Sequence, residues 1–181
     1  MKKEEILKNR VKIILAHKNG PDYFNDKEKD LMIKNYKENR KDKLSVPEEP
    51  TFWATFVFKG TSPGDLHCTH KFFGEMEDSS VKSILSTLDK YFSKNPFKTF
   101  KTVFNKEEFF GQDKNIRVIT PVFINKSNFL VDLRDKLQKY KPDDYPEYLP
   151  HVTTETINKL DLPIVGYAFL FGNTTLRLYE E

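Results

Sequence analysis

Short apolar runs, rich in aromatic and β-branched residues, limit the possible folds of this chain more than any other feature of the sequence. The clearest runs are FWATFVF at 52–58, IRVITPVFI at 116–124 and IVGYAFLFG at 164–172. Such side chains favour buried strands, and loop signals such as GTSPGD at 60–65 separate the runs. Because other segments have helical periodicity, residues 51 onward predict a mixed α and β domain.

Apolar residues recur with helical spacing in two of these segments, at 81–92 and at 129–137. Ser79 and Ser80 are the expected caps at the start of the first helix. Further strands are expected at 66–73, 97–104, 148–154 and 174–180. Each half of the domain thus contributes one strand that carries a histidine, although sequence identity between the halves is too slight to define a repeat.

Residues 1–50 form a charged extension to this domain. They contain 13 Lys and Arg against 10 Asp and Glu, whereas residues 51–181 contain 17 of each. Apolar residues at helical spacing predict one helix between Ile6 and Leu15 and a weaker helix over 26–41. A solvated or disordered arm is the alternative for the extension.

The composition limits the partners and the compartment. The balanced charge of residues 51–181 favours a small or short anionic ligand over a long duplex, which would need a basic stripe. Cys68 is the single cysteine, so no intrachain disulfide and no multi-cysteine metal site can form. Because no segment is typical of a leader peptide or a membrane span, we expect a cytoplasmic protein without a membrane partner.

Two of the four histidines occur in the pattern His-x-Thr, as His67 with Thr69 and His151 with Thr153. Residues i and i+2 of a strand project from the same face, so each histidine has a hydroxyl beside it. One imidazole can take a proton while a second gives one, and the hydroxyls can hold a phosphate in line. Which histidine is the acid stays open. This chemistry requires neither a metal nor a cofactor.

The two motifs resemble those of the two-histidine phosphoesterases, the LigT-like or 2′-5′ RNA ligase-like superfamily. HCTHKFFG at 67–74 is similar to the first family motif, and PHVTT at 150–154 is similar to the second. FFGQDKNIRVITPVF at 109–123 resembles the stretch between them. The resemblance covers about residues 52–179 and leaves the extension outside.

The resemblance implies an α+β, bilobal and pseudo-symmetric fold, with two antiparallel sheets flanked by helices around a central cleft. It also implies a metal-independent phosphodiesterase that acts on 2′,3′-cyclic phosphates or 2′-5′ linkages in nucleotides or short RNA. Some relatives in phages degrade cyclic oligonucleotide immune signals, and the resemblance does not choose among these substrates. The resemblance assigns the catalytic roles to His67, Thr69, His151 and Thr153.

The sequence departs from the family pattern at several positions. His70 and Thr154 stand where the family usually has leucine, and the basic residue often found after the second motif is absent. His70 alternates away from His67, which predicts a structural histidine, with tuning of the site as the alternative. By the same alternation Lys71 shares the face of His67, so we expect it near the phosphate. Lys59 and Arg117 are other possible phosphate contacts.

Aromatic residues near the motifs are candidates for stacking on a nucleotide base. They are Phe109 and Phe110 beside Gly111, and Tyr145 and Tyr148 ahead of His151. Core packing is the alternative for each of them, as it is for Trp53. Cys68 alternates away from the site and is expected to be a small buried residue rather than a nucleophile.

Two other classes of function remain possible on the sequence alone. In the first, the cleft holds a nucleotide or an RNA end without turnover, although binding alone does not require two titratable groups. In the second, the resemblance is accidental and the protein is a structural interaction module. The sequence does not reveal the oligomeric state.

Overall fold

The computed structural model describes residues 51–74, 76–145, 147–172 and 174–181. The helices predicted between residues 6 and 41 lie outside the described residues. The described elements, in chain order, are β1 (Phe52–Phe58), β2 (Cys68–Gly74), α3 (Asp78–Lys94), β3 (Phe104–Phe110), β4 (Ile116–Pro121), the 3-10 helix η1 (Lys126–Phe129), α4 (Val131–Leu137), β5 (Val152–Thr153), β6 (Ile164–Phe171) and β7 (Thr174–Glu180).

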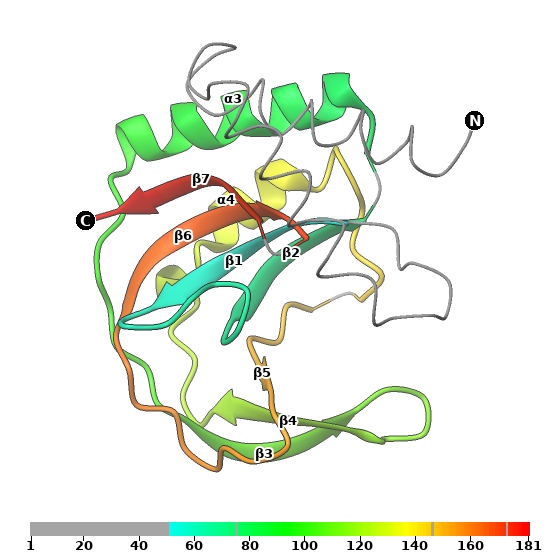
Figure 1. Cartoon of the computed structure of the whole chain (residues 1–181), viewed down its shortest axis with the longest axis vertical. Helices are drawn as coiled ribbons and strands as arrows, with labels where there is room; N and C mark the ends of the chain where they lie inside the picture. The colour runs from blue at the N-terminus through cyan, green and yellow to red at the C-terminus, as the bar shows by residue number, and fades with distance from the viewer. Residues whose placement is uncertain (1–50, 75, 146, 173) are drawn as a thin grey trace, which may run out of the picture. The chain divides into compact units, whose positions relative to one another are not determined.

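The strands form two antiparallel sheets, as predicted. One has four strands in the order β2-β1-β6-β7, and the other has three in the order β3-β4-β5 (Figure 1). The second sheet is smaller, because it has one strand fewer and because β5 contributes only two residues. The predicted α+β class with two antiparallel sheets is therefore confirmed, while the symmetry between the halves is incomplete.

The central strands β1 and β6 form the core of the four-stranded sheet. All seven residues of β1 are buried, and so are seven of the eight residues of β6. On one face of β1, Phe56 contacts Phe129 and Tyr167 edge to face. On the other face, Trp53 and Val57 cluster with residues of β6. A strand covered on both faces explains why the sequence is almost continuously apolar here.

Both α-helices of the described residues contact the four-stranded sheet. Phe92 of α3 stacks on Tyr179 of β7 with ring centroids 4.3 Å apart. Arg134 of α4 donates from its Nε to the carbonyl of His70 in β2, at 3.0 Å. In the part of the chain that the structure describes, neither helix is long and apolar enough to cross a membrane.

Several local predictions are wrong. The strand predicted at 148–154 is reduced to β5, Val152–Thr153, and the strand predicted at 116–124 ends at Pro121. Helix α3 begins at Asp78 after Glu77, so Ser79 and Ser80 lie inside its first turn and do not cap it. The predicted strand at 97–104 is also displaced, because Phe100 makes a single bridge to Ile164 and the paired strand β3 starts at Phe104. Pairing with β4 across the turn at Gly111, which has a φ of 94°, selects the later segment.

His70 is a buried structural histidine, as the alternation in β2 predicts. Its Nε2 lies 3.2 Å from the carbonyl of Leu130 and its Nδ1 lies 2.7 Å from the hydroxyl of Tyr167. A carbonyl only accepts hydrogen bonds, so Nε2 carries the proton and Nδ1 accepts from the hydroxyl. Burial, together with the charge of Arg134, lowers the pKa of His70 to about 3.

This buried histidine predicts a pH dependence of stability. Between its ordinary pKa of 6.5 and its folded-state pKa of about 3, the unfolded chain binds a proton that folded His70 does not. The free energy of unfolding therefore falls with decreasing pH, by up to about 1.4 kcal/mol per pH unit from this group. His70→Gln should show a shallower dependence in urea unfolding from pH 7 to pH 4. Equal slopes in both proteins would contradict the assignment.

Candidate active site

His67 lies immediately before β2 and packs against the core. Its ring lies 4.4 Å from the Trp53 ring, centroid to centroid, and its Nδ1 is buried without a hydrogen-bond partner among the described residues. Burial lowers the pKa of His67, and the charge of His151 lowers it further. At neutral pH the protein therefore holds His67 uncharged, in the form that can accept a proton.

His151 lies immediately before β5. Its Nδ1 is 2.8 Å from the carbonyl of Leu149, and the ring of Phe110 approaches it with centroids 4.8 Å apart. Because the carbonyl only accepts, Nδ1 carries a proton and Nε2 remains for another partner. Pairing of Val152 and Thr153 with β4 sets the position of this segment in the second sheet.

The fold brings the two His-x-Thr motifs together. The thiol of Cys68, next to His67, lies 3.8 Å from the hydroxyl of Tyr148 and hydrogen-bonds with the backbone of His151. Thr69 is half-buried and Thr153 is exposed. Within the described ranges neither threonine hydroxyl makes a hydrogen bond, so both can serve a ligand.

Lys71 is not available to a phosphate, contrary to the sequence prediction. A register shift between Ala54 and Thr55, which pair with Lys71 and Thr69, interrupts the regular alternation of β2. The side chain of Lys71 is 1% exposed and its Nζ lies 2.5 Å from Oδ1 of Asp143. Burial lowers the pKa of Lys71 while the hydrogen bond and charge of Asp143 oppose this, so the ammonium is part of an internal ion pair.

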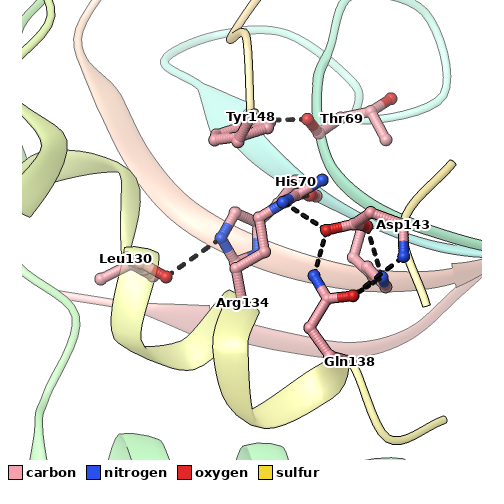
Figure 2. A network of polar contacts seen from close by, with 8 residues as sticks. Thr69, His70, Leu130, Arg134, Gln138, Asp143 and Tyr148 are labelled. Atoms are coloured by element: carbon pink, nitrogen blue, oxygen red, sulfur yellow. Dashed lines mark hydrogen bonds and ion pairs between the residues drawn. The ribbon is translucent and has the colours of Figure 1, made fainter. Parts of the chain in front are cut away.

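A network of polar side chains surrounds Asp143 (Figure 2). Its carboxylate accepts from Lys71, from Nη1 of Arg134 at 2.5 Å and from the amide of Gln138. Burial acts to raise the pKa of Asp143, but these hydrogen bonds and positive charges outweigh it and lower the pKa. Sequence reasoning missed Arg134, Gln138 and Asp143, because an ion pair between distant segments leaves no local pattern.

The aromatic candidates occupy different positions. Phe110 contacts His151, and the side chain of Tyr145 is 76% exposed, so a substrate contact for either stays a prediction. Tyr148, in contrast, donates its hydroxyl to the carbonyl of Thr69 at 2.8 Å and lies under the guanidinium of Arg134. Its ring also packs edge to face against His70 and Phe129, so it is engaged inside the protein, contrary to its predicted role as a stacking platform. Cys68 is fully buried, as predicted, and its thiol pKa rises to about 12.

Arg117 is also a structural residue rather than a phosphate contact. Its guanidinium pairs with Glu107 and donates to the carbonyls of Thr154 and Ile157 and to the side chain of Asn158. Lys59 is exposed in the loop after β1 and stays a candidate. Among the described residues, no group of three or more His, Cys, Asp or Glu side chains is arranged to hold a metal ion.

No protein-family model and no curated protein matches this sequence. Solved structures do match it. E. coli LigT complexed with NADP+ is 11% identical, with a TM-score of 0.50 over 73% of this chain and 98% of that chain. TT0787 of Thermus thermophilus is 13% identical, with a TM-score of 0.50 over 72% of this chain and 97% of that chain. The chain therefore has the fold of the LigT-like two-histidine phosphoesterases.

The electrostatic coupling of the two histidines can be measured without a substrate. His151→Gln removes a neighbouring charge, so the pKa of His67 should rise toward 6.5 while burial still holds it below that value. Histidine proton chemical shifts followed by NMR from pH 4 to pH 8 report this change. Phe110→Leu, which alters the neighbour of His151 but no charge, is the matched control. An unchanged His67 pKa in His151→Gln would show that the histidines do not interact.

Proposed function

We propose that residues 51–181 form a metal-independent phosphodiesterase that acts on nucleotides or short RNA with a 2′,3′-cyclic phosphate or a 2′-5′ linkage. The observation that supports the proposal is that the charge of His151, just before β5 of one sheet, acts on His67, just before β2 of the other sheet. Each of these histidines has a threonine two residues later. Two titratable groups of this kind serve proton transfer, whereas binding alone does not need them.

The proposed reaction on a cyclic phosphate is an attack of water on phosphorus. One imidazole takes the proton of the attacking water, and the other gives a proton to the ribose oxygen that leaves. The hydroxyls of Thr69 and Thr153 donate hydrogen bonds to the non-bridging oxygens, where negative charge develops in the transition state. Holding the phosphorus between the two motifs also orients the attack, which lowers the entropic part of the barrier.

The similar fold supports this class of activity, and the site chemistry supports the substrate class. A nucleotide, NADP+, is the molecule in the E. coli LigT complex. In this chain, Phe110 lies against His151, and a base bound beside it would stack on an aromatic face. Balanced charge in residues 51–181 favours a small substrate over a long polynucleotide.

A substrate panel in EDTA tests the proposal directly. The full chain is offered 2′,3′-cyclic nucleotides, 2′-5′ linked dinucleotides and cyclic di- and trinucleotides, with products separated by chromatography. We expect turnover of one class, and a loss of about 100- to 10,000-fold in kcat for His67→Ala and for His151→Ala, because each removes one proton-transfer group. Lys82→Ala, at an exposed position of helix α3, is the control that alters surface charge and should keep the wild-type kcat.

The outcomes separate the candidate functions. Turnover of cyclic oligonucleotides alone would assign the protein to the degradation of such signals. Tight binding measured by calorimetry, without product from any substrate, would replace the enzyme with a nucleotide-binding module. Full activity of both histidine variants would refute the two-histidine mechanism.

A further inference from the structure

The hydroxyl of Tyr148 connects the two histidine motifs. Tyr148 belongs to the segment that leads into His151, yet its hydroxyl donates to the carbonyl of Thr69 at 2.8 Å. The same oxygen lies 3.8 Å from the sulfur of Cys68. Because its hydrogen is used on Thr69, the hydroxyl oxygen accepts from the thiol. The side chain of Tyr148 thus bonds with Cys68 and Thr69, the two residues that directly follow His67, and fixes their positions relative to His151.

Arg134 holds the ring of Tyr148 from helix α4. Its guanidinium carbon lies 4.5 Å from the centre of the Tyr148 ring, a cation–π distance. The same guanidinium donates from Nε to the carbonyl of His70, at 3.0 Å, and pairs through Nη1 with Asp143. Figure 2 shows Tyr148 and Thr69 on one side of His70, with Arg134 and Asp143 nearby. Arg134 therefore contacts both the strand of the first motif and the segment before the second.

Asp143 attaches the beginning of the segment that leads into His151 to strand β2. Its carboxylate accepts from buried Lys71 of β2, and its backbone N–H donates to the side chain of Gln138 at 2.9 Å. The segment that leads into His151 is thus attached to β2 at Asp143 and again at Tyr148. A rigid double attachment is what a site needs when its two halves come from separate sheets.

We propose that Tyr148 is a positioning residue whose hydroxyl sets the separation of His67 and His151 for proton transfer. This inference rests on the proposed function and deepens it. We place Tyr148 outside the reacting atoms, because its hydroxyl bonds with Thr69 and Cys68 and its ring packs against Arg134, His70 and Phe129. Its effect is transmitted through the placement of the two imidazoles, and a misplacement of about 1 Å can cost about 100-fold in rate.

Tyr148→Phe isolates the hydroxyl, because the ring and its contact with Arg134 remain. We expect kcat to fall about 10- to 100-fold with little change in KM, since the phosphate and base contacts are retained while the proton-transfer distances change. We also expect the pKa of His67 to rise toward its ordinary value, because the charge of His151 acts on it from a greater distance. NMR titration measures this second effect without a substrate.

Tyr140→Phe is the matched control. It removes the same group from a tyrosine whose hydroxyl bonds with Thr87 and with the carbonyl of Ser83 on helix α3, and it should leave both kcat and the His67 pKa unchanged. Arg134→Lys is a second test that keeps Tyr148 intact and retains the positive charge but loses the Nε donor to His70. It should lower kcat in the same direction, and thermal unfolding of each variant shows that the fold is retained.

The results distinguish this inference from the proposed function. A wild-type kcat and a wild-type His67 pKa in Tyr148→Phe, with His67→Ala inactive, would overturn the positioning role and leave the phosphodiesterase intact. If the wild-type protein turns over no substrate, the proposed function fails, and a His67 pKa that does not move in Tyr148→Phe then overturns the positioning role as well. If Tyr148→Phe unfolds, an unaltered kcat in folded Arg134→Lys overturns it.

Discussion

The ion pair between Lys71 and Asp143 is the interaction on which the arrangement of the two motifs depends. A lysine ammonium is costly to bury, and here the carboxylate of Asp143 and the side-chain oxygen of Gln138 accept hydrogen bonds from Lys71. Arg134 pairs with the same carboxylate. These partners come from strand β2, helix α4 and the segment before β5. The network therefore joins the sheet that carries the first motif to the chain that carries the second.

The environments of the two histidines differ, although their sequence motifs are alike. His67 packs on Trp53, and its buried Nδ1 has no hydrogen-bond partner among the residues that the structure describes. Nδ1 of His151, in contrast, has a carbonyl partner at Leu149. Burial is the larger cause of the lowered pKa of His67, because it disfavours the charged form of the imidazole. The two motifs are therefore not equivalent in the structure. The first motif leads into a seven-residue strand of the larger sheet, whereas the second leads into a strand of only two residues.

Local patterns in the sequence predicted the parts of the fold in which burial is continuous or periodic. The apolar runs gave strands β1 and β6 within a residue or two, and helical spacing gave α3 and α4. Strand β3 was missed because most of its middle residues are polar and exposed, so it has no apolar run. Lys71 was misplaced because a register shift in its pairing with β1 cannot be read from β2 alone.

Cys68 lies where the two motifs meet, and this position has a consequence for how the protein can be observed. Its thiol is fully buried, contacts Tyr148 and hydrogen-bonds with the backbone of His151, and its raised pKa keeps it protonated. A thiol reagent can reach it only through a local opening, and its contact with Tyr148 makes a movement of the segment before β5 away from β2 the opening that we expect. As the single cysteine of the chain, it is a built-in label whose rate of modification reports how often the two halves of the site separate.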